Sequence, residues 1–454
     1  MLAVKLPSLQ LGEDRVVALA ADNGESWIKA DLACLAENKP CVPLPHFFTA
    51  EQMQWAVDSA GVDALLTDQP DLPIWQSLGF SQTGLDTGVL HKLTRVCAPV
   101  LLPSGTAKIT FTSGSTGNPK GVCLTQLAQE AVARSIADLM VSLGVKRHLC
   151  ALPLSVLLEN VAGAYAALLA GSVCITPSLS TIGWDGSSQW DPVAFLRCVQ
   201  SEKIHSAIIL PQMLKALLPI LDQFDVSSIK MLAVGGARVS PDLLAEAKRQ
   251  GLPVYEGYGL SECSSVVCFN QPGAEKPGTV GKPLAHASVR ISKEGELEVS
   301  GVAYAGYLGQ PAHDAPTWLP TGDLASIDSD GFVSISGRKK NLIISSFGRN
   351  ISPEWVESEL LCQPGILQCA VFGEAKPALV AIVVAPGLSD MELQCAIDEA
   401  NKKLPDYAHV KHVSRAVEPF SPNNGLATSN GRNKRNSIAE TYQKIINAMY
   451  GEEQ

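Results

Sequence analysis

A loop of small hydroxyl residues and glycines that ends in one lysine constrains this chain more than any other feature. Residues 109–125 read ITFTSGSTGNPKGVCLT, so a short β-type run precedes the loop and Lys120 closes it. Glycine lets the backbone approach a ligand closely and adopt positive φ values. Backbone N–H groups and hydroxyls can then surround a polyphosphate, to which the lysine adds a point charge. The segment therefore predicts a phosphate-binding loop after a strand.

The spacing differs from that of a Walker A loop, in which Gly-Lys is followed by Ser or Thr. Here Lys120 is followed by Gly121 and Val122, which disfavours a P-loop ATPase or kinase. Loops of Gly, Ser and Thr are also common as plain turns, so this segment alone leaves a structural role open. The residues expected to contact phosphate are Thr112, Ser113, Gly114, Ser115, Thr116 and Gly117.

The composition is that of a large globular protein. The 454 residues are 46% hydrophobic and 18% charged, enough for two or more domains with substantial cores. A net charge of −10 argues against nonspecific nucleic-acid binding, which depends on Lys and Arg. The N-terminus lacks the arrangement of a signal peptide, and the longest apolar stretch, 161–175, is short for a membrane span. The twelve cysteines form no CxxC pair and are expected to be reduced thiols in a cytoplasmic protein.

Strand-like and helical segments alternate over roughly the first 280 residues, which predicts mainly parallel sheets in an α/β fold. Short alternating segments after that point predict a small β-rich subdomain. The last hundred or so residues hold a further strand–helix set, expected to form a small α+β domain. The main expected strands are 16–20, 63–66, 205–210, 231–234, 253–255, 368–372 and 378–384, and the main expected helices are 50–60, 211–221, 241–251, 354–361 and 389–404.

A second constellation lies at residues 255–262, which read YEGYGLSE. Glycines on both sides of Tyr258 leave its ring free to stack on a purine, and Ser261 offers a hydroxyl to a phosphate oxygen. Glu262 is a hard oxygen ligand suited to Mg²⁺. A structural turn around a core tyrosine is the alternative interpretation. Residues 235–237 follow the preceding strand, and ligands gather at such carboxyl ends of parallel strands.

A third motif consists of two segments, 321–323 (TGD) and 337–343 (GRKKNLI). It combines one carboxylate with a run of cations. A buried aspartate such as Asp323 can accept hydrogen bonds from both ribose hydroxyls, and Arg338 can brace the same sugar or a phosphate. An isolated Thr-Gly-Asp is most often a turn. The prediction of a ribose site therefore depends on the order and spacing of all the segments.

Together these segments resemble the motifs of the adenylate-forming acyl-CoA synthetase superfamily, which includes acyl- and aryl-CoA ligases, luciferases and peptide-synthetase adenylation domains. The resemblance implies an AMP-binding domain at 1–338 and a small mobile domain at 339–454, with Lys340 as the hinge and Gly348 at the tunnel for the thiol. It implies metal binding by Thr112 and Glu262. It assigns adenine and ribose contacts to Gly235, Gly236, Ala237, Tyr258, Gly259, Ser261, Asp323 and Arg338.

The chain departs from the superfamily pattern near its C-terminus. The superfamily places a catalytic lysine in a Gly-Lys or Leu-Lys step, but the matching position here holds Arg432. Arginine keeps the charge but has a planar fork and a different reach. Lys434 could act instead if the register of the loop shifts, and a solvated basic turn is the alternative for it. In the acyl-pocket motif, Val156 stands where long-chain synthetases have histidine, which suggests an apolar acid.

The resemblance implies that the chain activates a carboxylic acid with ATP and Mg²⁺. The carboxylate attacks the α-phosphorus and releases pyrophosphate, and a thiol then takes the acyl group. Lys120, Arg432 and Lys434 are the candidate catalytic residues. The acceptor is coenzyme A or the phosphopantetheine of an acyl carrier protein, and the acid is a fatty or aryl acid. A degenerate sensor or scaffold that only binds ATP or acyl-adenylate is the alternative function.

Overall fold

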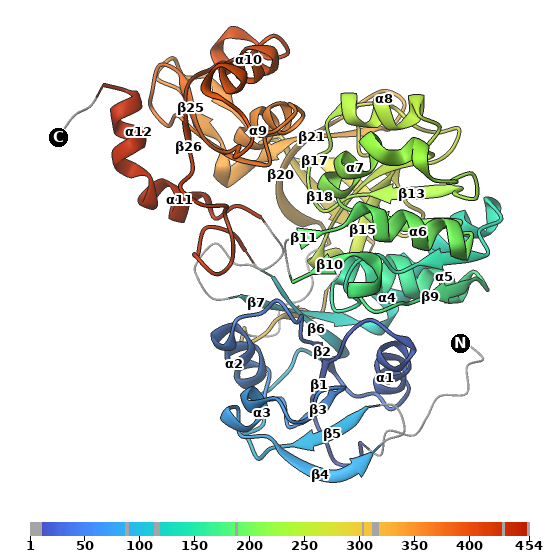
Figure 1. Cartoon of the computed structure of the whole chain (residues 1–454). Coiled ribbons are helices and arrows are strands. Elements are labelled where there is room, and N and C mark those ends of the chain that lie inside the picture. The colour runs from blue at the N-terminus through green and yellow to red at the C-terminus, as the bar shows by residue number, and fades with distance from the viewer. Residues whose placement is uncertain are drawn as a thin grey trace.

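The computed structural model describes residues 11–86, 90–112, 119–186, 189–301, 304–310, 317–428 and 432–451. Figure 1 shows a large part, coloured blue to yellow, and a smaller orange-to-red part beside it. Two sheets of the large part enclose a layer of helices, and a third, smaller sheet leads to the small part. None of the helices in these ranges is long and apolar enough to cross a membrane.

The first sheet has eight strands and carries the phosphate loop between two of them. Its central pairs β6–β2, β2–β1 and β1–β3 are parallel, and the outer pairs are antiparallel. The order is β19 (Gly306–Tyr307), β7 (Lys120–Thr125), β6 (Thr106–Thr112), β2 (Cys41–Pro43), β1 (Val17–Ala20), β3 (Ala64–Thr67), β5 (His91–Thr94) and β4 (Ser81–Asp86).

The second sheet has seven strands. Helices α7 (Pro211–Leu217) and α8 (Pro241–Arg249) connect strands of this sheet that are parallel neighbours. The pairs from β14 to β9 are parallel, whereas β15 and β16 are antiparallel at one edge. The order is β16 (Lys282–Pro283), β15 (Ser265–Phe269), β14 (Val254–Leu260), β13 (Met231–Val234), β12 (Ser206–Ile209), β8 (Arg147–Leu149) and β9 (Val173–Ile175).

The helices of the large part cover both sheets. They are α1 (Glu25–Ala36), α2 (Ala50–Ser59), α3 (Pro73–Ser77), α4 (Gln126–Ser142), the π-helix η1 (Leu158–Tyr165), α5 (Ala166–Leu169), α6 (Pro192–Glu202), α7 (Pro211–Leu217) and α8 (Pro241–Arg249). Short 3₁₀ turns are η2 (Ser180–Ile182), η3 (Leu218–Gln223) and η4 (Ser261–Cys263), and a small hairpin pairs β10 (Trp184–Asp185) with β11 (Gln189–Trp190).

The third sheet and the small part follow. The third sheet orders β17 (Ser288–Ile291), β18 (Glu296–Ser300), β20 (Leu319–Ile327) and β21 (Val333–Arg338), and the 3₁₀ turn η5 (Lys339–Asn341) leaves it. The small part contains β22 (Ile343–Ile344), β23 (Asn350–Ile351), α9 (Pro353–Leu361), β24 (Gln368–Phe372), β25 (Leu379–Val384), α10 (Asp390–Asn401), η6 (Asp406–Ala408), β26 (Val410–Arg415), α11 (Arg435–Thr441) and α12 (Gln443–Met449).

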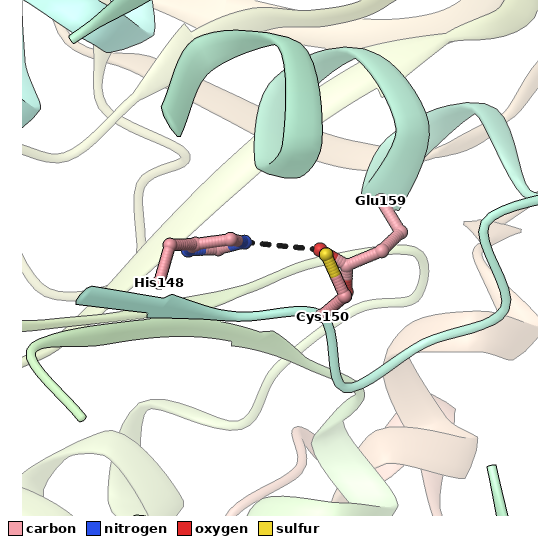
Figure 2. A group of neighbouring side chains, drawn as sticks. All are labelled: His148, Cys150 and Glu159. Atoms are coloured by element: carbon pink, nitrogen blue, oxygen red, sulfur yellow. Dashed lines mark hydrogen bonds and ion pairs between the residues drawn. The ribbon is translucent and has the colours of Figure 1, made fainter. Parts of the chain in front are cut away.

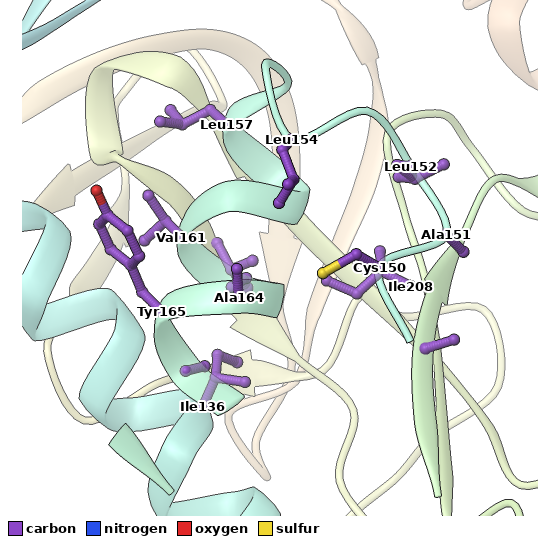
Figure 3. Packing of buried hydrophobic residues seen from close by; sticks show 14 of the residues in the cluster. Ile136, Cys150, Ala151, Leu152, Leu154, Leu157, Val161, Ala164, Tyr165 and Ile208 are labelled. Atoms are coloured by element: carbon purple, nitrogen blue, oxygen red, sulfur yellow. The ribbon is translucent and has the colours of Figure 1, made fainter. Parts of the chain in front are cut away.

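The largest core cluster joins both sheets of the large part through the helices between them. Figure 3 shows η1 beside the second sheet: Ala164 lies nearer Cys150 and Ile208, and Val161 and Tyr165 lie together on the other side of the helix. Such burial of apolar area stabilises the layered arrangement by roughly 25 cal/mol per Å². The segment 161–175, expected as a buried helix and strand, is η1, α5 and β9.

The α/β fold class is confirmed, with the β-rich third sheet and the small α+β part where the sequence predicts them. Met231–Val234 and Gln368–Phe372 have the expected bounds. Two details differ. The first sheet is parallel only in its centre and the second is antiparallel at one edge, because hairpins such as β6–β7 and β14–β15 add antiparallel strands. The helix expected at 211–221 changes to a 3₁₀ helix at Leu218, directly before Pro219.

Candidate nucleotide site between the two parts

A carboxylate with two donors lies where the second and third sheets meet. Asp323 on β20 is 3% exposed and pairs in register with Arg338 at the end of β21. Its Oδ1 lies 2.7 Å from Arg338 Nε, and its Oδ2 accepts a hydrogen bond of 2.6 Å from the hydroxyl of Tyr258 on β14. An ionised carboxylate has about four acceptor sites, so both oxygens can still accept from a ligand's hydroxyls.

Burial and neighbouring groups have opposite effects on the charge of Asp323. Burial raises the pKa of its carboxyl, while the charges of Arg338 and Arg432 and the Tyr258 hydroxyl oppose that rise. A buried carboxylate is costly unless cations and hydrogen bonds compensate it. The two arginines therefore keep a buried acceptor available in its charged form.

The carboxyl end of β13 forms another wall of the site. Gly235 and Gly236 follow Val234, and Gly236 has a φ of 84°, which favours glycine. The carbonyl oxygen of Gly236 accepts a hydrogen bond of 2.9 Å from Arg432 Nη2 of the small part. Arg432 and the residues expected at the adenine therefore meet, although they lie far apart in the sequence.

The segment around Arg432 is fixed to the small part by its neighbours. Arg435 makes a bidentate pair with the buried Glu357 of α9, with bonds of 2.6 and 2.9 Å. Asn433 Nδ2 donates to the carbonyl of Cys369 at 2.6 Å. Lys434 immediately precedes α11, and its backbone N–H donates to Leu426 O at 2.9 Å. From this segment the side chain of Arg432 reaches the large part.

A set of cations faces the same region. Lys120, the first residue of β7, lies with its Nζ 5.6 Å from the ring centre of Tyr307. The pKa of Lys340 is lowered by partial burial and then by the charges of Arg338 and Lys120. Lys120, Arg338, Lys340 and Arg432 are therefore close enough to interact, and such a concentration of positive charge suits a polyphosphate.

The two expected metal ligands occupy different segments. Glu262 lies in η4 after β14, and its Oε1 accepts a hydrogen bond of 2.9 Å from Tyr307. Thr112 ends β6, directly opposite Lys120 in the β6–β7 pair. The other phosphate-loop residues lie outside the described ranges: Ser113, Gly114, Ser115, Thr116 and Gly117. A half-buried carboxylate beside clustered cations is a donor of the type that Mg²⁺ takes.

Three further expected residues have local roles that the structure makes plain. Gly259 lies at a bulge between β14 and β15, where a Cβ atom would overlap the backbone of Ser265. Ser261 opens η4. Gly348 has a φ of 70° in the β22–β23 turn and donates its N–H to Ser345 O at 2.8 Å, so its described bond stays within the hairpin.

Sequence reasoning missed several residues of this region. Tyr307 connects Lys120 to Glu262, but it lies on a two-residue strand with no motif around it. Arg435 is another: a basic residue in a polar segment usually lies on the surface, and here it is half-buried and paired with the buried Glu357. The buried position of its partner could be read only from the fold.

A buried polar cluster beside the nucleotide region has a structural explanation. Figure 2 shows His148 and Cys150, which share one face of the β8 segment, next to Glu159 of η1. His148 bonds to Glu159 Oε1 at 3.1 Å and to Ser206 Oγ at 2.9 Å, and Glu159 Oε2 accepts from the N–H of Leu152 at 2.9 Å. These bonds account for the burial of both side chains.

The neighbouring residue anchors the same π-helix to the other sheet. Asn160 and Tyr165 contact the buried pair of Asp31 on α1 and Lys108 on β6, whose Nζ and Oδ2 are 2.9 Å apart. Polar contacts from two consecutive residues thus fix η1 between both sheets. β6 continues to Thr112, so the position of this expected metal ligand depends on the same packing.

Fold and site together define a two-part protein in which a buried carboxylate lies near several cationic side chains at the junction of the parts. The AMP-binding enzyme family matches residues 1–308, and the AMP-binding enzyme C-terminal domain matches residues 340–454. The chain therefore belongs to the AMP-binding enzyme family, and the resemblance inferred from its motifs is confirmed.

Individual relatives have low sequence identity to this chain, but the similarity covers most of its length. The chain is 27% identical to a long-chain-fatty-acid–CoA ligase of Mycobacterium bovis, over 97% of this chain and 88% of that protein. It is 32% identical to a feruloyl-CoA synthase of Amycolatopsis, over 71% of this chain and 62% of that protein. The fold is similar to that of an O-succinylbenzoate coenzyme A synthetase of Bacillus subtilis solved with ATP and magnesium, with a TM-score of 0.74, 24% identity and coverage of 93% and 89%.

Proposed function

We propose that this chain is an AMP-forming acid–thiol ligase that activates an apolar carboxylic acid with ATP and transfers it to coenzyme A. The observation that carries the proposal is the meeting of Asp323, Tyr258 and Arg338 with Arg432 at one site. That arrangement offers acceptors to a ribose and positive charge to phosphates. The named relatives are CoA ligases, which favours coenzyme A over a carrier protein as the acceptor.

The residues divide the work of the first step. Asp323 would accept the ribose hydroxyls, Tyr258 would present its ring to the adenine, and Gly235, Gly236 and Ala237 would line the base. Lys120 and Arg432 would neutralise the phosphates as the carboxylate oxygen attacks the α-phosphorus and pyrophosphate leaves. Thr112 and Glu262 would hold Mg²⁺, which supplies further charge neutralisation. Positioning and electrostatics of this kind carry most of the catalysis in such displacements.

The second step would use the small part differently. In this proposal residues 339–454 rotate about Lys340, the turn at Gly348 then lines the tunnel for the thiol, and the thiol sulfur attacks the acyl carbonyl with AMP as the leaving group. The phosphopantetheine of an acyl carrier protein is the second candidate acceptor. Residues 1–338 would form the nucleotide-binding domain throughout.

The acid is proposed to be fatty or aryl. Val156 and Leu158 are half-buried apolar side chains at the start of η1, beside the buried Leu157. A wall of this type favours an apolar acid through the hydrophobic effect. A cytoplasmic location suits the chain, because its cysteines are all free thiols.

The test is a pyrophosphate-release assay over a panel of fatty and aryl acids, run with and without coenzyme A. We expect acid-dependent pyrophosphate and AMP, with a thioester only when coenzyme A is present. Lys120→Ala should lower pyrophosphate release by about a hundredfold or more with an unchanged melting temperature. Release of ADP, or unchanged turnover in Lys120→Ala, would remove the proposal.

The sensor alternative predicts a different result: AMP binding without pyrophosphate release from any acid. Its support was the arginine in place of lysine at position 432. The contact of that arginine with Gly236 keeps a cation at the site, and the relatives give the alternative no support.

A further inference from the structure

Polar contacts made by cationic side chains connect the small part to the large part near the nucleotide site. Arg432 donates to Gly236 O, Lys403 forms an ion pair with Asp242 of α8, and Lys215 of α7 contacts the end of α9. Figure 1 shows α9 on the side of the small part that faces α7 and α8. The contacts differ greatly in how well they are shielded from water.

The Lys215 contact is the most extensive of the three. Its ammonium donates to the backbone carbonyls of Leu361, Gln363 and Ile366, at 2.9 Å for Gln363 and 3.2 Å for Ile366. An ammonium has three donors, so this geometry uses all of them. Lys215 is half-buried, whereas both partners of the Lys403–Asp242 pair are exposed, and exposed pairs contribute little.

The acceptors are groups that a helix cannot satisfy by itself. α9 ends at Leu361, and the last carbonyls of a helix lack partners and carry the negative end of its dipole. Gly365, with a φ of 82°, turns the chain tightly after the helix, and a Cβ atom there would overlap Leu388. This turn brings the carbonyls of Gln363 and Ile366 beside that of Leu361.

Both ends of the contact are rigid. Lys215 lies in the last turn of α7, which is buried through Met213, Leu214 and Leu217. On the other side, Glu357 of α9 holds Arg435, so the position of α9 fixes the segment that carries Arg432. A displacement at the end of α9 would therefore be transmitted to the guanidinium at the nucleotide site.

We propose that Lys215 is a positioning residue for adenylate formation: by holding the C-terminal end of α9, it docks the small part in the orientation in which Arg432 reaches the nucleotide. The inference rests on the proposed function. Lys215 does not touch the reacting atoms in this scheme. Its contacts are made in the docked orientation and are given up when the small part rotates for the thiol step.

The experiment separates the two half-reactions in Lys215→Met, which keeps the length of the side chain, and in Lys215→Arg, which keeps the charge. Pyrophosphate release should fall by about 5- to 150-fold in Lys215→Met, the range of a typical coupling between sites. Thioester formation from preformed acyl-adenylate should be unchanged or faster. Lys215→Arg should restore most of the first rate.

Lys230→Met is the matched control. Lys230 also donates to a backbone carbonyl, that of Gly144 at 2.7 Å, but both residues belong to the large part. The control should leave both half-reactions unchanged. A first-step rate in Lys215→Met equal to that of the parent, or an equal loss in both half-reactions, overturns the proposal.

Small-angle X-ray scattering keeps the proposal testable without turnover. Lys215→Met, if it melts like the parent, should show a larger radius of gyration than the parent and than Lys230→Met, because the small part is less docked. If the parent releases no pyrophosphate with any acid, the proposed function fails, and the scattering alone decides on Lys215. Identical scattering of Lys215→Met and the parent in that case overturns the docking role as well.

Discussion

The large part builds its share of the nucleotide site within its own sheets, whereas the small part reaches that site from outside through a few side chains. Asp323 and Arg338 face each other because β20 and β21 pair in register, and Tyr258 comes from an adjacent strand end. Arg432 makes its described contact across the junction, with the carbonyl of Gly236. Strand pairing fixes the first set independently of where the small part lies.

This difference between the two parts predicts that nucleotide binding and the chemical steps depend on different residues. A set held by sheet register should bind the nucleotide in any orientation of the small part. A group delivered by a second body acts only when that body is docked, which is how domain motion gates many enzymes. Substitutions of Asp323 or Tyr258 should therefore lower nucleotide affinity, and substitutions of Arg432, or of a residue that docks the small part, should lower the rate of one step.

The largest effect is expected for Arg432→Ala. Pyrophosphate release should fall by about a hundredfold or more, because one preorganised cation at a developing charge is lost. Thioester formation from preformed acyl-adenylate and AMP affinity should remain near the parent values. The measurements are both half-reaction rates and a calorimetric titration with AMP.

Two variants sharpen this result. Arg432→Lys should keep or raise the first rate. Lys434→Ala should change little, since the described contact with Gly236 is made by Arg432. A large first-step loss in Lys434→Ala alone would move the role to that lysine. An equal loss of AMP affinity in Arg432→Ala would break the separation of binding from chemistry.

The next effect is that of Asp323→Ala on binding. The ribose should lose hydrogen bonds to a charged acceptor, each worth about 1.5–3 kcal/mol, so AMP affinity should fall by at least roughly ten- to a hundredfold, the value for one bond. The measurement is calorimetric titration with AMP. The exposed Asp330→Ala of the same subdomain is the control. Unchanged affinity would exclude Asp323 from the site.

The sequence predicted these two parts of the site unequally, for a physical reason. Asp323 and Arg338 lie in motifs whose spacing reflects the pairing of β20 with β21, a local and regular constraint, and Tyr258 lies in a glycine-flanked motif on β14. Lys215 and Arg435 lie in no motif, because their partners are a helix end and a buried carboxylate supplied by distant segments. Tertiary packing brings these groups together, and sequence spacing carries no signal for it.

A smaller effect is expected for Tyr258→Phe, which removes the 2.6 Å hydrogen bond to Asp323 and keeps the ring. AMP affinity should fall by about three- to tenfold, because Asp323 loses one of the donors that orient it. Tyr258→Ala should cost more, since it also removes the stacking surface. Tyr255→Phe, on the same strand, should leave the affinity unchanged in the same titration.

The smallest effect is on the stability of the large part and concerns Glu256. Burial raises the pKa of this carboxyl to about 8, although the N–H of Val239 and the charge of Arg238 oppose the rise. Because the folded-state pKa lies above the unfolded one, the native state binds the extra proton between them. The stabilisation is complete below the unfolded pKa and is lost as the pH rises through about 8.

Glu256→Gln keeps the shape of the protonated side chain and cannot ionise. The parent should lose about 1 kcal/mol of unfolding free energy between pH 7 and 8 from this group, and the variant should not. Urea unfolding at both pH values gives the difference, with the exposed Glu51→Gln as the control. Parallel pH dependence of the parent and Glu256→Gln would show that Glu256 is already ionised in the folded state.

Because β14 holds both Glu256 and Tyr258, AMP affinity should stay constant in the variant at pH 7, which would confirm that the binding half of the site is set by strand register.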